Sequence, residues 1–186
     1  MRVGVLASGS GTILRAMLDR QLPIAVVLAD RPCGALVIAE DAGIGAELVP
    51  RSDFGPTFDR VAYTKEVVAA LERHDVDLVA IAGFGTILSE LFVDSFGARA
   101  VNTHPALLPA FKGWHAVRDA LAAGVKVTGC TVHLVTEEVD SGPILAQEAL
   151  PVLDDDTEET LHERIKQVER RLYPDEIERL VREGAR

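Results

Sequence analysis

Two polar side chains lie two residues apart at the end of a short apolar run. Segment 100–105 reads Ala-Val-Asn-Thr-His-Pro, so the run delivers an amide at Asn102 and an imidazole at His104. Residues i and i+2 of a strand point to the same face, and a proline at position 105 keeps a strand or helix from simply continuing. The spacing predicts that Asn102 and His104 project together from a strand end, where α/β sheets commonly place their chemistry.

An amide and an imidazole on one face suit acyl chemistry. Asn102 can donate to a developing oxyanion, and His104 can move a proton or, as a cation, help to hold the oxyanion. A carboxylate beside the imidazole would orient it and favour its protonated form, and Asp140 in the loop 137–142 is the candidate. No serine or cysteine stands in a nucleophile elbow, so we expect direct attack by a substrate nucleophile. The alternative is that Asn102 and His104 are turn residues that hydrogen-bond to backbone.

A glycine loop, Ser-Gly-Ser-Gly-Thr at 8–12, lies between the first predicted strand and the first predicted helix. Backbone N–H groups at a helix N-terminus can hold a phosphate. No lysine follows Gly11, which excludes a P-loop, and Leu14 stands where a dinucleotide fingerprint needs its third glycine. Two glycines therefore favour a single phosphate. Asp30 nevertheless ends the second predicted strand, where an NAD-binding fold carries its ribose-binding acid, so that alternative stays open, as does a turn without ligand.

The remaining chain alternates between strand-like and helix-like segments. Strands are predicted at 3–7, 23–29, 46–49, 76–82 and 98–103, and helices at 13–20, 35–42, 57–73, 87–95 and 114–123, with a turn-rich loop at 52–56. Segments 125–136 and 143–152 read as an antiparallel strand pair, and 158–182 as a long helix interrupted at Pro174. The pattern predicts an α/β fold: a doubly wound, mostly parallel Rossmann-like sheet with an antiparallel C-terminal strand pair, in three α/β/α layers. We expect one domain over 1–186, with a nucleotide- and phosphate-binding half at 1–99 and a catalytic half at 100–186.

Charge and composition exclude several classes of protein. The net charge is −10, which argues against a surface that binds nucleic-acid phosphates. No apolar run approaches the roughly 20 residues of a membrane span. Cys33 and Cys130 lie far apart, and no His, Cys or Asp cluster has metal-ligand spacing, so we expect reduced thiols and no metal. The expectation is a cytoplasmic protein with small-molecule partners, without nucleic-acid or membrane partners, as a monomer or homodimer.

Three stretches carry a resemblance to a known family. They read VNTHPALLPAFKG at 101–113, VTGCTVHLVTEEVDSGPILAQ at 127–147 and ERIKQVE at 163–169. They closely resemble the glycinamide ribonucleotide formyltransferase family, and the resemblance runs from the first strand to Pro174. It implies formyl transfer from 10-formyltetrahydrofolate, as co-substrate, to the amine of phosphoribosylglycinamide in de novo purine synthesis. By the same resemblance Asn102, His104 and Asp140 form the catalytic triad, with His104 as proton donor and a water near Asp140 relaying a proton to the leaving folate nitrogen.

The resemblance also implies the binding residues, and it makes 100–186 the folate-binding half as well as the catalytic one. The ribonucleotide phosphate would lie in the loop Ser10, Gly11, Thr12 and Ile13, with Lys166 and Glu169 contacting phosphate and ribose or glycinamide. The formyl folate would be held by Arg60, Gly85, Thr86, Ile87, Leu88, Asn102, Thr136, Glu137, Glu138, Val139 and Asp140. The other histidines are expected to be structural (His133) or solvent-exposed (His74, His115, His162).

The chain departs from the family pattern at a few positions. Gly85-Thr86 stands where the family commonly has Met-Arg, Thr12-Ile13 where it commonly has Ser-Asn, and Ala106 replaces a common serine. Two alternatives remain: a formyltetrahydrofolate deformylase, which uses water as acceptor, and a Rossmann-type nucleotide-binding module. The nucleotide-binding alternative leaves the Asn–His–Asp set without a role.

Overall fold

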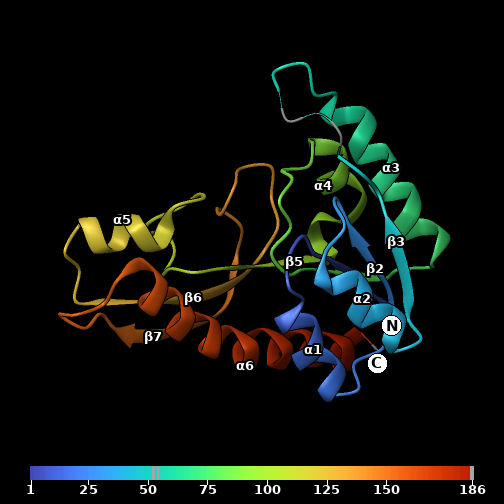
Figure 1. The fold of residues 1–186 in the computed structure, drawn as a ribbon. Helices are drawn as coiled ribbons and strands as arrows, with labels where there is room; N and C mark the ends of the chain where they lie inside the picture. The colour runs from blue at the N-terminus through green and yellow to red at the C-terminus, as the bar shows by residue number, and fades with distance from the viewer. Residues whose placement is uncertain (52, 54, 185–186) are drawn as a thin grey trace.

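The computed structural model of the chain describes residues 1–51, 53 and 55–184. One seven-stranded sheet runs through it in the order β3-β2-β1-β4-β5-β6-β7 (Figure 1). The parallel strands are β1 (Val3–Leu6), β2 (Ile24–Ala29), β3 (Gly45–Leu48), β4 (Leu78–Ile81) and β5 (Ala100–His104). β6 (Val127–Leu134) pairs antiparallel with β5, and β7 (Ile144–Pro151) antiparallel with β6. The predicted mostly parallel sheet with an antiparallel C-terminal pair is confirmed.

Helices cover both faces of this sheet (Figure 1). They are α1 (Thr12–Asp19), α2 (Gly34–Asp41), α3 (Arg60–Arg73), α4 (Glu90–Phe96), α5 (Ala116–Ala122) and α6 (Glu158–Gly184). Val3 and Val5 of β1 belong to an apolar cluster with α1, α2 and α6, whereas Leu6 belongs to a second cluster with α3 and α4. Successive strand residues point to opposite faces, so one strand supplies both clusters and the fold has three layers.

Helix α6 corrects one prediction, because it runs through Pro174 without interruption. A proline inside a helix removes one backbone donor and its ring clashes with the carbonyl of the preceding turn, which together cost about 3 kcal/mol. Here the neighbouring turn is anchored, since Tyr173 and Ile177 are fully buried and the Tyr173 hydroxyl donates to the Val101 carbonyl at 2.8 Å. Tertiary packing therefore outweighs the local preference at Pro174.

Helix starts differ from the predicted ones by two or three residues in three other places. α5 begins at Ala116 rather than at 114, so Trp114 lies before the helix. α3 begins at Arg60 rather than at 57, because the Asp59 carboxylate caps it by accepting from the Ala62 N–H. α4 begins at Glu90 rather than at 87. Of the predicted turn-rich loop at 52–56, residues 52 and 54 lie outside the described residues.

The start of α1 depends on a glycine. Gly11 has φ of 77°, in the left-handed region, and a Cβ added there would lie 2.8 Å from the Ala35 Cα of α2. Neither the dihedral nor the close approach of α2 admits a side chain without strain. The loop therefore brings its backbone against α2 and opens α1 at the carboxyl edge of the sheet.

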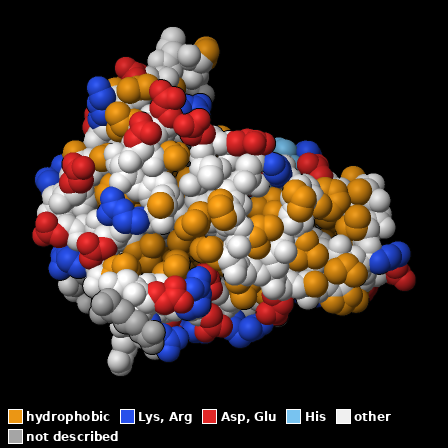
Figure 2. All heavy atoms as spheres, turned by 180° about the vertical axis from the view of Figure 1, so that it is seen from behind, with side chains coloured by type: hydrophobic (Ala, Val, Ile, Leu, Met, Phe, Trp, Pro, Cys, Tyr) orange, Lys and Arg blue, Asp and Glu red, His pale blue; other side chains and the backbone are white. Residues whose placement is uncertain are grey.

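Seen from behind, hydrophobic side chains gather on the half of the molecule that carries α5, β6 and β7 (Figure 2). Val127 of β6, Ile144 of β7 and Leu153 just beyond β7 are exposed hydrophobic residues of this half of the chain. No helix in the described ranges has the length and apolar character that crossing a membrane requires.

Candidate active site

A cavity of about 730 Å³ lies at the carboxyl ends of the central strands. Its walls come from the loop before α1, the segment between β4 and α4, the end of β5, the loop after β6 and the middle of α6. The side chains of Asn102, His104 and Asp140, which the sequence places 38 residues apart at most, all line it. The structure therefore brings the three predicted catalytic residues together in one space.

His104 lies between two acceptors. Its Nδ1 is 3.3 Å from Asp140 Oδ2, and its Nε2 is 2.7 Å from the Phe111 carbonyl oxygen. The His104 and Asp140 side chains are only 5% and 6% exposed. An imidazolium carries an N–H on each ring nitrogen, so the protonated form satisfies both contacts.

Asp140 is held from three directions. Its Oδ2 accepts from the Gly113 N–H at 2.8 Å, and its Oδ1 lies 3.6 Å from His133 Nε2. Burial raises the pKa of this carboxyl, but the contact with His133, the hydrogen bond from the Gly113 N–H and the charge of His104 outweigh it, so the pKa lies below its usual value. Asp140 therefore keeps its negative charge at neutral pH.

His133 is part of the site, although the sequence pointed only to a structural role. It lines the cavity directly opposite Asn102 in the β5–β6 pairing, and its Nε2 lies 3.2 Å from Asn102 Nδ2. Its Nδ1 lies 2.9 Å from the Leu134 carbonyl oxygen, which leaves Nε2 as an acceptor in the neutral ring. One amide proton of Asn102 is thereby fixed, and the second is left for a ligand.

The predicted ribonucleotide residues gather at another part of the same cavity. Those that line it are Ser10, Gly11, Thr12, Ile13, Lys166 and Glu169. Glu169 Oε1 accepts from the Thr103 hydroxyl at 2.9 Å, and burial raises the pKa of Glu169 despite that bond. Ile13 is buried in the apolar core, so its contribution to a ligand there is its backbone.

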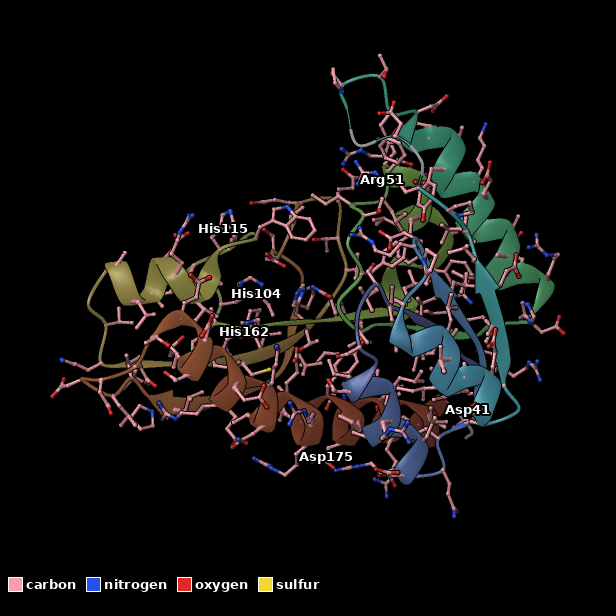
Figure 3. All side chains as sticks on the ribbon, in the orientation of Figure 1. Asp41, Arg51, His104, His115, His162 and Asp175 are labelled. Atoms are coloured by element: carbon pink, nitrogen blue, oxygen red, sulfur yellow. The ribbon has the colours of Figure 1, made fainter. Side chains whose placement is uncertain are left out.

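His162 was expected to be exposed, and that expectation is wrong. It is half-buried on α6, one turn before Lys166, and lines the cavity with His104 (Figure 3). Burial and then the charge of Lys166 lower its pKa, so the ring is neutral at pH 7. His74 is likewise half-buried, with Nε2 3.3 Å from Glu47 Oε2, whereas His115 is exposed as expected.

Most residues predicted for the formyl folate line the cavity as well. Besides Asn102 and Asp140 they are Thr86, Ile87, Leu88, Thr136, Glu137, Glu138 and Val139. Apolar side chains such as Phe84, Phe92 and Val135 complete this wall. Two of the residues predicted for the folate, Gly85 and Arg60, are not among the described residues that line the cavity. The Gly85 N–H donates to Ser8 Oγ, and Arg60 is exposed at the first residue of α3.

The Gly85-Thr86 pair is fitted to Asp30 and Arg31. Thr86 Oγ1 donates to Asp30 Oδ2 at 2.8 Å, and Arg31 donates to both Asp30 oxygens at 2.9 and 3.0 Å. A Cβ at Gly85 would lie 2.7 Å from Arg31 Nη2, so Arg31 occupies the space of any larger side chain. The Asp30 side chain is fully buried in these contacts, which leaves it unable to bind a nucleotide ribose.

Residues 1–177 match the formyl transferase family, and the chain belongs to it. The fold and the cavity thus define a protein of the formyl transferase class.

Individual relatives are more specific. The chain is 50% identical over 188 residues to the phosphoribosylglycinamide formyltransferase of Mycobacterium tuberculosis, covering 98% of this chain and 86% of that protein. It is 42% identical over 192 residues to the trifunctional purine biosynthetic protein adenosine-3 of Gallus gallus, covering all of this chain and 19% of that one. The crystal structure of glycinamide ribonucleotide transformylase 1 from Symbiobacterium toebii superimposes with a TM-score of 0.90 at 44% identity, covering 99% of this chain and 88% of that one.

Proposed function

We propose that the chain transfers the formyl group of 10-formyltetrahydrofolate to the amine of phosphoribosylglycinamide, in purine biosynthesis. The observation that carries the proposal is the meeting of Asn102, His104 and Asp140 with a phosphate-type loop in one cavity. Among the relatives named above, one is a phosphoribosylglycinamide formyltransferase and another is a trifunctional purine biosynthetic protein, which supports the proposal. A nucleotide-binding module would give Asn102, His104 and Asp140 no role.

The ribonucleotide binds across α1 and α6. Its phosphate takes the backbone N–H groups at the start of α1 and the Lys166 ammonium, both of which complement its charge. Glu169, fixed by Thr103, accepts from the ribose hydroxyls. This directs the amine toward the end of β5.

The amine lone pair then attacks the formyl carbon, and the carbonyl π electrons move to the oxygen. Asn102 donates to that oxyanion through its remaining amide N–H, and the His104 cation donates through Nε2–H, which exchanges the Phe111 carbonyl for the ligand oxygen while Nδ1 keeps its contact with Asp140. The intermediate collapses with cleavage of the carbon–nitrogen bond to the folate, and the folate nitrogen leaves with the electron pair. The proton that the amine loses balances the proton that this nitrogen gains, so no net proton is consumed.

Asp140 stabilises the His104 cation throughout, since its own lowered pKa keeps it ionised. The transfer is direct. Cys130 supports this, because burial raises the pKa of its thiol to about 12 and keeps it un-ionised at neutral pH.

The donor is of the folate type, and its flat ring system lies against Ile87, Leu88 and the loop at 136–140. Absence of a metal requirement, a cytoplasmic location, a single functional domain and a monomeric or homodimeric state remain predictions.

The test is turnover of 10-formyltetrahydrofolate by purified protein, followed by absorbance with and without phosphoribosylglycinamide. We expect tetrahydrofolate to form only when the ribonucleotide is present. Folate turnover without the ribonucleotide would instead identify a deformylase.

Two histidine variants make a matched pair for this assay. His104→Ala should lower kcat by roughly 100-fold or more, the usual cost of losing an acid–base or oxyanion group. His115→Ala, at an exposed position outside the cavity lining, should keep wild-type rates. Equal rates for both variants would remove His104 from the mechanism.

A further inference from the structure

Trp114 is the most exposed large hydrophobic side chain in the described part of the chain, at 67% exposure. It nevertheless belongs to the cavity lining, as does Val139, which is 44% exposed. An indole left in water at the mouth of a substrate cavity is apolar surface that a bound ligand can cover. The mechanism above gives it no role.

The segment 111–114, which we call the strap, holds this indole in place. The Phe111 carbonyl accepts from His104, and the Gly113 N–H donates to Asp140. Lys112 Nζ donates to Ser141 Oγ at 2.6 Å and lies 3.3 Å from Glu138 Oε1. The strap is therefore tied by backbone and side-chain contacts of the three residues that precede Trp114.

These ties place the strap over one half of the cavity. Apart from the His104 contact they run to residues 138–141, in the loop that lines the donor side. The opposite side, with its phosphate-type loop and Lys166, is built by α1 and α6. The two sides also differ in what they offer a ligand. The side with the phosphate-type loop has the Lys166 ammonium, whereas an indole offers a phosphate only its single N–H.

We propose that Trp114 is a specificity-determining residue for the formyl donor, and that its indole stacks on the aromatic part of the bound folate. The inference rests on the proposed function, which supplies an occupant with an aromatic benzoyl ring and a pterin. Offset stacking of aromatic rings adds to binding beyond the area that it buries. The indole touches no reacting atom, so it contributes to donor binding equally before and during the transfer, and KM changes while kcat does not.

The chain contains a single tryptophan, so its fluorescence reports on this position alone. Collisional quenching by acrylamide is measured on the free protein, with saturating 10-formyltetrahydrofolate, and with saturating phosphoribosylglycinamide. We expect the donor to lower the quenching constant by about half or more, because a stacked ring excludes the quencher. We expect the ribonucleotide alone to leave it unchanged.

Kinetics of two variants give a second readout. Trp114→Ala should raise the KM for the donor roughly 3- to 10-fold, with little change in kcat or in the KM for the ribonucleotide. Trp114→Phe, which retains a ring, should restore most of the affinity. Val37→Ala removes another exposed hydrophobic side chain, on α2 and outside the cavity lining, and should match the wild type.

Three outcomes would overturn the inference. One is an unchanged quenching constant when calorimetry shows the donor bound. Another is a wild-type donor KM in Trp114→Ala, and the third is a loss of kcat in both Trp114 variants, which would make the indole a structural part of the strap. Failure of the proposed function itself is distinguished by the wild-type protein, which would then neither bind the donor nor transfer its formyl group.

Discussion

Among single residues, Asp140 carries the strongest local constraint in the cavity. It is a non-glycine residue with φ of 53°, and it receives a backbone N–H, faces two imidazoles and is almost fully buried. Asp and Asn tolerate the left-handed region better than other side chains. The backbone at Asp140 and the charge of its carboxylate can therefore be tested separately.

Replacing Asp140 by Asn keeps the shape and the tolerated dihedral but removes the charge beside His104. We expect kcat to fall roughly 100-fold or more, because the imidazolium loses its counter-charge. The KM for each substrate should change little. Steady-state kinetics measures this, and an unaltered kcat would show that His104 works without a carboxylate.

The Lys166 ammonium can be removed in the same way. Lys166→Met keeps the apolar stem, and the KM for the ribonucleotide should rise roughly 10- to 100-fold, the worth of a hydrogen bond to a charged group. Lys126→Met is the matched control, since Lys126 lies far more exposed in a pair with Asp154. A similar rise in both variants would point to general electrostatics rather than to a phosphate contact.

Two histidines show what could not be predicted from sequence at this scale. The strand alternation shows that Asn102 and His104 share a face, but the position of His133 depends on which residue of β6 pairs with Asn102. That register is set by long-range packing, which one sequence does not display. His162 lies one turn from Lys166 on α6, and this spacing was a usable signal that the expectation of exposure overlooked.

At the scale of elements, the entry into α1 forms the proposed phosphate-binding loop. The glycines at 9 and 11 differ sharply: a Cβ at Gly9 meets nothing within 4 Å, whereas at Gly11 it meets α2 at 2.8 Å with φ of 77°. Gly11→Ala should lower the free energy of unfolding by about 1–3 kcal/mol, from strain and overpacking. Gly9→Ala should remain within about 0.5 kcal/mol of the wild type.

Chemical denaturation of the two glycine variants measures this difference. Equal stability would mean that α2 can move away from the loop without cost.

Elements were predictable where local pattern and tertiary packing agree. The buried strands of the sheet and the helices between them follow from apolar periodicity, and the structure has them all. The predicted interruption at Pro174 is wrong, because Tyr173 and Ile177 are buried in the core and hold the helix on both sides of the proline. The predicted start of α4 at residue 87 is wrong for a related reason. Residues 86–89 line the cavity, and the helix begins at Glu90.

For the molecule as a whole, buried carboxylates set the acid limit of stability. Burial raises the pKa of Asp30, but its hydrogen bonds from Arg31, Ser8 and Thr86 outweigh this and hold the pKa below the usual value. A carboxyl with a lowered pKa in the folded state stabilises the protein above its unfolded pKa of about 3.9 and loses that contribution as the pH falls through the folded value.

Asp30→Asn should therefore lower the free energy of unfolding at pH 7 by about 1–3 kcal/mol. The difference from the wild type should shrink as the pH falls below about 4, because the carboxyl of the unfolded chain is protonated first and Asp30 of the folded protein only at lower pH. Urea denaturation from pH 7 down to pH 3 checks this, with Asp154→Asn as the exposed control. A difference that stays constant with pH would exclude an electrostatic origin.

The last helix, α6, packs against the middle of the sheet, so the site is completed only late in synthesis of the chain. Thr103 donates to Glu169, which follows it by 66 residues, and the Val101 carbonyl accepts from the Tyr173 hydroxyl, which follows it by 72 residues. A chain growing on a ribosome exposes Asn102 and His104 well before either partner has been made. In the proposed mechanism, the contacts that α6 makes with the ribonucleotide therefore form only after Lys166 and Glu169 have been synthesised.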